Sequence, residues 1–353
     1  MNLRRLLSIV LALLLIILFL LIMYGNSTDS IEITPKENAS IAVTGDVMFS
    51  RNMESVLSLD SSPFEGVSNV TSNVDLLLIN FENPATTSEN VVKNDIPFKC
   101  NPVYVPLARA NNNTVAGLAN NHAFDYGAEG MNDTFKYLKE ANITAMGAGN
   151  SEDEAHQEVV KEINGRKITI LNYMDADNFV EYADIMPPAN GSSAGFSAYD
   201  SEDAYQKISE NNDSDLIIAY LHFGNEYSTS PNDDQIRIAH ELIDYGADVV
   251  IGSHPHVTQG IEMYKGKPIF YSLGNFIFDM TGDEISRAYF VQIDLVGDTG
   301  ECTVYPVYNS NYIPQYMDAD SGKELLTGLS PRAGEMNITD DGIGKLTFNL
   351  TDA

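Results

Sequence analysis

The chain of 353 residues is strongly acidic: 50 Asp and Glu residues stand against 20 Lys and Arg residues, and the formal net charge is −30. Because this field repels phosphates and no basic patch offsets it, we expect no nucleic acid partner. Hydrophobic residues make up 44% of the chain, which excludes intrinsic disorder. The only cysteines, Cys100 and Cys302, can form a single bridge or remain apart as buried thiols, and they cannot build a Cys-rich zinc site.

Residues 1–24 are typical of a cytoplasmic stub and a transmembrane anchor. Arg4 and Arg5 precede an unbroken apolar run, Leu6 to Tyr24, which is long enough to span a bilayer as a helix. No small-x-small cleavage site follows, so an uncleaved anchor is favoured over a cleaved signal peptide. The two arginines then predict a single-pass protein of the cell membrane, with a cytoplasmic N-terminus and an extracellular C-terminal domain. We expect residues 25–40 to form a polar stalk.

Ten Asn-x-Ser/Thr sequons, more than the composition suggests by chance, agree with export. They indicate a glycoprotein, although Asn-rich and Ser/Thr-rich loops also generate unmodified sequons.

From residue 41 onward, short apolar runs alternate with segments of helical periodicity, which predicts an α/β domain over residues 41–295. Helices are predicted at 130–142 and 233–247, the second with Gly246 as its C-cap. Residues 296–353 are predicted to form a C-terminal extension with an edge strand at 302–308 and a weakly patterned tail. The apolar runs are typical of strands buried on both faces, and the predicted strands are 41–46, 75–82, 113–122, 167–173, 215–223, 248–256 and 268–276.

Residues that bind metals or transfer protons gather at the ends of these predicted strands. Ligands bind at the carboxyl ends of strands in open α/β sheets. His254 and His256 are spaced by two, so on an extended segment they would point to the same side. Imidazoles, carboxylates and an amide oxygen together suit a divalent cation such as Zn²⁺, Mn²⁺ or Fe²⁺. As single residues, some have simpler interpretations as turn, cap or core residues: Asp46, Glu82, Asn121 and His222.

The chain resembles the CapA family of capsule synthesis (poly-γ-glutamate biosynthesis) proteins over about two thirds of its length. The motifs that carry this resemblance follow the family's order: GDVMFSR, LLINFENP, GLANNHAFDYGAEGMNDT, LHFGNEY and GADVVIGSHPHVTQGIEMYKGKPIFYSLGNFIFD. That family is similar in fold to calcineurin-like metallophosphoesterases. The resemblance implies a four-layer α-β-β-α sandwich, in which two sheets are flanked by helices and a binuclear metal site lies at the strand ends.

The resemblance also implies roles for individual residues. Asp46 and His256 would hold one metal ion, Glu82 would bridge to a second ion, and the second would be held by Asn121, His222 and His254. His122 takes the position of the catalytic histidine that protonates the leaving group, with Asp125 to orient it. Substrate contacts are predicted for Arg51, Glu226 and Asn275.

Two residues depart from the metallophosphoesterase pattern. Met48 stands where those enzymes have the histidine of Asp-x-His, and Glu82 replaces their bridging aspartate. The sequence therefore leaves open whether the site binds one ion instead of two and whether the protein has lost catalysis.

The resemblance implies a role in the synthesis or export of an extracellular anionic polymer, poly-γ-glutamate or another capsule, alongside other membrane components of a capsule synthase. Two alternatives stay open: a surface metal-dependent phosphoesterase unrelated to capsule, and a non-catalytic polymer-binding module. Because the exported domain is acidic, we predict that polymer binding needs divalent cations or high salt.

Overall fold

The computed structural model describes residues 37–93, 95–176, 187–332, 334 and 336–350, which fall in one compact unit. The predicted anchor and most of the predicted stalk lie outside these residues. Within the described ranges, no helix is both long and apolar enough to cross a membrane. The stalk prediction is wrong at its end, because the first strand already begins at Ala39.

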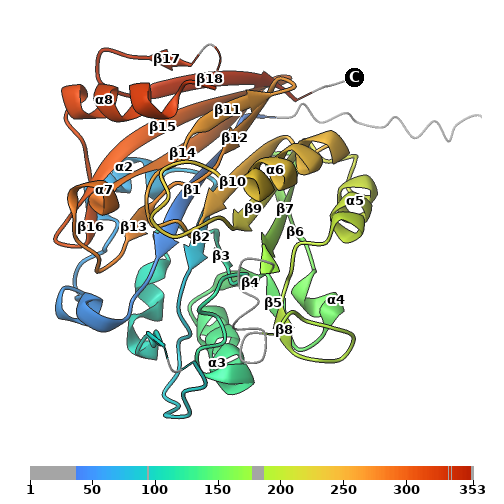
Figure 1. Cartoon of the computed structure of the whole chain (residues 1–353), viewed down its shortest axis with the longest axis vertical. Coiled ribbons are helices and arrows are strands. Elements are labelled where there is room, and N and C mark those ends of the chain that lie inside the picture. The colour runs from blue at the N-terminus through green and yellow to red at the C-terminus, as the bar shows by residue number, and fades with distance from the viewer. Residues whose placement is uncertain (1–36, 94, 177–186, 333, 335, 351–353) are drawn as a thin grey trace, which may run out of the picture. The chain divides into compact units, whose positions relative to one another are not determined.

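The larger of two mixed β-sheets has ten strands among the described residues (Figure 1). The first strand along the chain lies in its interior, with parallel and antiparallel neighbours on its two sides. In spatial order the sheet contains β17 (Asn337–Ile338), β18 (Gly344–Asn349), β15 (Thr299–Ser310), β14 (Arg287–Val296), β1 (Ala39–Val47), β2 (Leu76–Phe81), β3 (Thr114–Gly117) and β4 (Ile143–Met146). Two short strands pair with it off this path: β13 (Asn275–Ile277) with β1, and β16 (Ile313–Tyr316) with β15.

The smaller sheet has six strands in the described part of the chain, and its central strands run parallel. Its spatial order is β11 (Ile261–Tyr264), β12 (Lys267–Phe270), β10 (Val249–Ser253), β9 (Leu216–His222), β7 (Arg166–Met174) and β6 (Val159–Ile163). A separate pair is formed by β5 (Ala148–Gly149) and β8 (Gly195–Phe196).

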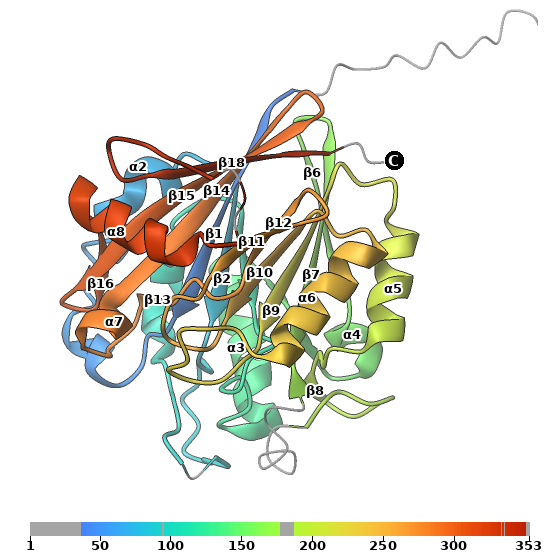
Figure 2. The ribbon, with the colours of Figure 1, turned by 45° about the horizontal axis from the view of Figure 1, so that its top comes forward.

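The two sheets pack face to face between outer layers of helices. One apolar cluster joins the inner faces of both sheets, with Val43 and Leu78 from the larger sheet and Ile170 and Ile218 from the smaller one. A second cluster packs helices on the outer face of the larger sheet, and a third packs α5 and α6 on the smaller sheet (Figure 2). The helices are α2 (Ser68–Thr71), α3 (Gly127–Glu140), α4 (Glu152–Ala155), α5 (Ser201–Glu210), α6 (Asp233–Tyr245), α7 (Asp283–Ser286) and α8 (Ala319–Leu329), with 3-10 turns η1 (Arg51–Ser55), η2 (Glu65–Val67) and η3 (Pro102–Ala108). The predicted α/β class is confirmed.

The helix α6 shows how closely local sequence determines an element. Asn232 caps its N-terminus, and the side chain of Gln235 completes a reciprocal capping box. Gly246 ends it in the left-handed conformation with φ 117°, which confirms the predicted C-cap.

The strand predicted at 268–276 is wrong as a single element, because the chain changes sheets within it. β12 ends at Phe270 in the smaller sheet, and β13 begins at Asn275 in the larger sheet beside β1. Gly274 takes a φ of 74° in this crossing, and its carbonyl accepts a hydrogen bond from the backbone N–H of Asp46 at 3.2 Å. A Cβ added at Gly45 would lie 2.0 Å from the same carbonyl oxygen, so only glycine fits there.

The predicted edge strand at 302–308 is a strand, but it is not at an edge. β15 lies between β14 and β18. The residues of β18 alternate between buried and exposed, with Leu346 and Phe348 facing the inter-sheet core. This part of the tail therefore extends the larger sheet. The two cysteines are free buried thiols in different apolar clusters.

Candidate metal centre

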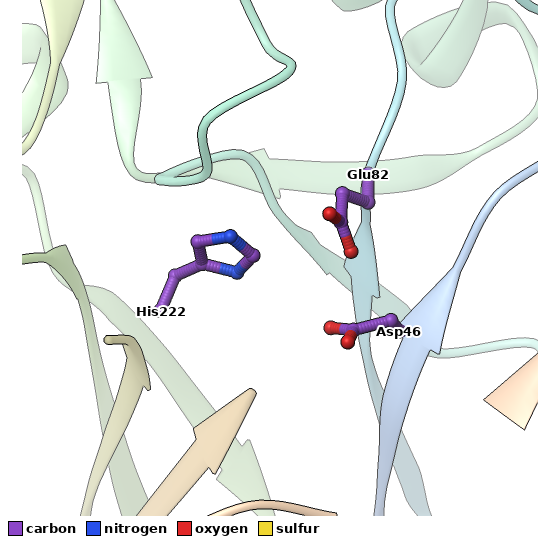
Figure 3. A group of neighbouring side chains, drawn as sticks. All are labelled: Asp46, Glu82 and His222. Carbon is purple, nitrogen blue, oxygen red and sulfur yellow. The ribbon is translucent and has the colours of Figure 1, made fainter. Parts of the chain in front are cut away.

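Three buried side chains converge where strands of the two sheets end. Asp46 lies near the end of β1, Glu82 directly follows β2, and His222 is the last residue of β9. Each offers one ligand atom, and these atoms all lie within 4.8 Å of one another. The three side chains point toward a common space (Figure 3). Parallel pairing of β1 with β2, which places Asp46 opposite Asn80, brings the two carboxylates to the same edge of the larger sheet.

Asn80 links all three of these side chains. Its Nδ2 donates to Oδ1 of Asp46 at 2.8 Å and to Oε2 of Glu82 at 3.3 Å, and lies 3.3 Å from Nδ1 of His222. The carboxamide of Asn120 in turn donates to Oδ1 of Asn80 at 3.1 Å. The carboxylates are therefore held in place by a fixed amide network.

The two carboxyl groups have opposite electrostatic environments. Burial, together with the negative charge of Asp46, raises the pKa of Glu82 well above its ordinary value. Burial also acts to raise the pKa of Asp46, but the hydrogen bonds with His256 and Asn80 and the charges of the nearby histidines together outweigh it, and the pKa of Asp46 is lowered. The charged form of Glu82 is therefore disfavoured beside Asp46 unless a cation balances the pair.

The remaining predicted ligands surround this cluster. Nε2 of His222 lies 2.9 Å from Oδ1 of Asn121, and its ring centroid is 4.7 Å from that of His254. Nδ1 of His256 donates to Oδ1 of Asn275 at 2.9 Å, and its Nε2 lies 3.8 Å from Oε1 of Glu82. Burial lowers the pKa of His254 to about 3, so this imidazole is neutral, as a metal ligand must be.

The predicted extended segment at His254–His256 is wrong. Both histidines have left-handed backbone conformations, with φ values of 101° and 59°. Their rings lie with centroids 6.0 Å apart because the chain turns at each histidine, not because alternate residues of a strand share a face.

The residues present fit a divalent cation. Two carboxylates, an amide oxygen and three imidazoles form a mixed oxygen and nitrogen donor set. Oε1 of Glu82 is buried and has no hydrogen-bond partner among the described residues, which is costly unless another group satisfies it.

A second constellation adjoins the cluster. Nδ1 of His122 and Oδ2 of Asp125 share a 2.7 Å hydrogen bond, and the ring of Phe98 stacks on His122 with centroids 3.6 Å apart. The backbone N–H of Phe98 also donates to Oδ2 of Asp125 at 2.6 Å. Burial raises the pKa of Asp125 to about 8, and burial together with the nearby Lys93 ammonium lowers the pKa of His122 well below its ordinary value.

A cavity of about 350 Å³ is lined by His122 and by residues that contact the metal cluster, although Asp46, Glu82 and His222 are not among its described lining residues. The predicted residues that line it are Arg51, Asn121, His122, Glu226, His254 and His256. Asn275 is not among its described lining residues; it is buried and contacts His256. Arg51 forms an ion pair with Asp279, and its guanidinium lies 4.4 Å from the centroid of Phe98.

A family model described as bacterial capsule synthesis protein PGA_cap matches residues 40–280, more than half of the chain. The chain belongs to this capsule synthesis family. It is 33% identical over 320 residues to the PGA biosynthesis protein CapA of Bacillus subtilis (strain 168), covering 88% of this chain and 82% of the relative. It is 32% identical over 350 residues to the capsule biosynthesis protein CapA of Bacillus anthracis, covering 96% of this chain and 82% of the relative.

Solved structures are more distant from this PGA_cap family member. A hypothetical protein from Thermus thermophilus is 14% identical, with 78% of this chain and 95% of that chain covered and a TM-score of 0.43. That score is too low to support any conclusion about function.

The sequence of this capsule synthesis protein does not reveal several residues of the site. Asn80 sits within an apolar strand, and nothing in the letters LLINFE marks it as the link between Asp46, Glu82 and His222. Lys93 and Phe98 lie in an aperiodic segment after β2. Tyr227 did have a usable signal, because it directly follows Glu226 in a motif of the family resemblance.

Proposed function

We propose that this protein supports the synthesis or export of an extracellular anionic polymer, poly-γ-glutamate or another capsule, and binds a divalent cation at Asp46, Glu82 and His222. Membership of the capsule synthesis family supports the process. The convergence of these three buried side chains beneath an open cavity is the observation that carries the metal site. The apolar run at Leu6–Tyr24 supports a membrane anchor with the domain outside the cell.

The other predicted ligands would complete the site. Asn121 and His254 would extend it from the side of His222, and His256 would extend it from the side of Asp46. A bound cation would neutralise the two carboxylates and attract an anionic ligand or activate a water molecule. Asn80 and Asn275 would orient Asp46, Glu82 and His256, as outer hydrogen-bond partners of metal ligands commonly do.

Hydrolysis of a phosphoester is a second candidate function, favoured by the hydrogen bond between His122 and Asp125. Because Nδ1 of His122 is engaged by Asp125, Nε2 is the ring nitrogen that would give a proton to a leaving oxygen. Asp125 and the stacked Phe98 would hold the ring in place, and Arg51 and Glu226 would contact the substrate. Met48 argues against a complete binuclear site, because it is fully buried and supplies no imidazole.

Metal titration tests the site. Glu82→Gln should fold normally, since a neutral amide of the same size replaces a carboxylate whose charged form is disfavoured by burial, yet it should lose most affinity for Mn²⁺ or Zn²⁺ in isothermal titration calorimetry. Glu158→Gln is the matched control, because Glu158 bonds Lys207 and Asn211 away from the cavity. A wild-type protein that binds neither ion would overturn the metal site.

Two further experiments separate the functions. A chromosomal deletion that leaves surface polymer unchanged would remove the capsule role, and externally added protease that fails to cleave the protein in intact cells would remove the outward orientation.

An activity assay separates the enzyme from the binding module. Divalent-dependent hydrolysis of a generic phosphodiester, abolished by His122→Ala, would support the enzyme. Metal binding without turnover would support a polymer-binding module.

A further inference from the structure

Strained backbone is concentrated around the cavity. Among the described residues, ten that are not glycine have positive φ angles, and five of these line the cavity: Arg51, Ile96, Tyr227, His254 and His256. Such conformations are unfavourable for side chains with a Cβ, and above all for a β-branched residue such as Ile96 with φ 46°. Strain of this kind persists where the position of a side chain matters for function.

Two of these strained residues are also large, apolar and open to solvent. Ile96 is 60% exposed and Tyr227 is 51% exposed, although the floor of the same cavity is buried and polar. The ring of Tyr227 lies beside that of His256, with centroids 6.3 Å apart. The backbone N–H of Tyr227 donates to the carbonyl of Pro255 at 2.8 Å, which ties this ring to the segment that carries His254 and His256.

Arg51 supplies a fixed cation to the same cavity. One carboxylate oxygen of Asp279 pairs with Nη2 of Arg51, and the other accepts from the backbone N–H of Asn52 at 3.0 Å. The guanidinium also lies over the rings of Phe98 and Phe278, with centroid distances of 4.4 Å and 5.7 Å. The hydrogen bonds found for this side chain among the described residues use Nη2 alone, and about a third of the side chain is exposed.

The charges of the cavity rule out attraction by net charge. Asp95 and Glu226 line it together with Arg51 and Lys93, and the carboxylates of Asp46 and Glu82 lie beneath. Recognition of an anionic chain by the side chains of the cavity therefore depends on individually placed cations such as Arg51 and on the apolar parts of the chain.

We propose that Arg51, Ile96 and Tyr227 form a recognition rim for a γ-linked glutamate unit, an inference that rests on the proposed function in polymer synthesis or export. Each γ-linked unit carries a free α-carboxylate and has methylenes in its backbone. Arg51 binds the carboxylate through its planar fork, and Ile96 and Tyr227 pack against the methylenes. An α-linked glutamate peptide has the same charge but no methylenes in its backbone, so it binds more weakly.

The test is binding of a fluorescein-labelled, short γ-linked oligoglutamate to the full-length protein with Mn²⁺ present, measured by fluorescence anisotropy. Arg51→Ala and Tyr227→Asn should each raise Kd about tenfold, whereas the exposed, distant Arg237→Ala and Tyr205→Ala should leave it unchanged. Arg51→Lys keeps the charge without the fork and should give an intermediate Kd. Asn tolerates the left-handed conformation at residue 227, so Tyr227→Asn should unfold at the same or a higher temperature while its binding is weakened.

The outcomes separate this inference from the function on which it rests. If the wild type binds the γ-linked probe and the rim variants bind equally well, the rim is wrong and the polymer role survives. If the wild type binds no probe with Mn²⁺ present, the polymer role in the proposed function fails as well. The probe could also be displaced by inorganic phosphate but not by unlabelled γ-linked oligomer. That result would assign the anion site at Arg51 to a phosphoester and overturn the γ-glutamate assignment.

Discussion

Two histidine–aspartate pairs in this protein share one geometry and differ in their surroundings. In the cavity, His122 and Asp125 are joined by a 2.7 Å hydrogen bond; beside α5, His156 and Asp203 are joined by one of 2.9 Å. In both pairs the contact runs from Nδ1 to Oδ2. Geometry alone therefore does not distinguish a pair at a functional site from a structural one.

The environments push the two carboxyl groups in opposite directions. Burial raises the pKa of Asp125 to about 8, and Oδ1 of Asp125 has no hydrogen-bond partner among the described residues. Burial also acts to raise the pKa of Asp203, but the hydrogen bonds with His156 and the hydroxyl of Tyr173, together with nearby positive charge, outweigh it, and the pKa is lowered. Burial therefore determines the direction of the pKa shift in the cavity pair although Lys93 Nζ lies 3.9 Å from Oδ1 of Asp125, whereas hydrogen bonds and nearby charges determine it in the outer pair.

The largest expected difference between the two regions is in metal binding. His222→Ala removes one of the three converging ligands, so the affinity for Mn²⁺ or Zn²⁺ should fall by more than about a hundredfold, since even outer partners of metal ligands contribute tenfold to a hundredfold. His156→Ala is the matched control and should leave the affinity unchanged. Calorimetric titration of both variants measures the metal affinity. An equal loss of affinity in both would contradict the difference between the cavity and the region of His156.

The next effect is a pH dependence of stability from Asp125, measured in EDTA. Its folded pKa of about 8 lies above the unfolded value of about 4, so the folded state binds the extra proton between these pH values. The free energy of unfolding of the wild type should therefore fall, relative to Asp125→Asn, as pH rises from 5 to 8, by at most about 1.4 kcal/mol per pH unit. Urea unfolding at several pH values measures the difference in the free energy of unfolding between the two proteins. A difference that stays constant from pH 5 to 8 would contradict a raised pKa of Asp125 in the folded state.

The pH dependence of stability that comes from Asp203 should have the opposite sign and lie at lower pH. Its folded pKa lies below the unfolded value, so its contribution to stability is present above pH ~4 and is lost as pH falls through the folded pKa. Asp203→Asn should lower the free energy of unfolding by about 1–2 kcal/mol at pH 7, the size of a hydrogen bond to a charged group. If the wild type and the variant still differ equally at pH 3, the charge of Asp203 is not the cause.

The smallest effect concerns the acidic surface that surrounds both pairs. With a net charge of −30, raising NaCl should screen repulsion and raise the unfolding temperature by a few degrees, equivalent to about 1 kcal/mol. The difference between the wild type and Asp125→Asn should not change with salt, because Asp125 is fully buried. A salt-dependent difference would mean that solvent reaches this carboxyl group.

The sequence predicts the strands and the site residues for the same reason. Apolar runs such as 75–82 and 215–223 are long enough to mark strands, and parallel strands bring the residues that follow them to one edge. Glu82 and His222 can therefore be recognised from sequence as strand-end residues, but β2 and β9 belong to different sheets, so the proximity of these two residues depends on how the sheets pack.

What escapes the sequence depends on contacts between distant segments. The apolar run at 268–276 does not reveal that β12 and β13 belong to different sheets, because the change depends on the fit of Gly274 against Gly45. The sequence predicts β15 as an edge strand because its neighbour β18 lies in a short segment after a turn-rich stretch and is not evident from the sequence. The role of Asn80 depends on His222, 142 residues away.

The crossing from β12 to β13 limits how the site can be reached. The two sheets are joined covalently beside Asp46, and Gly45 lies against Gly274 with no room for a methyl group. This close contact opposes separation of the sheets at the site. A long polymer of the kind proposed above would then meet the site by lying across the cavity, an approach that suits an internal unit of an unbroken chain as well as it suits a free end.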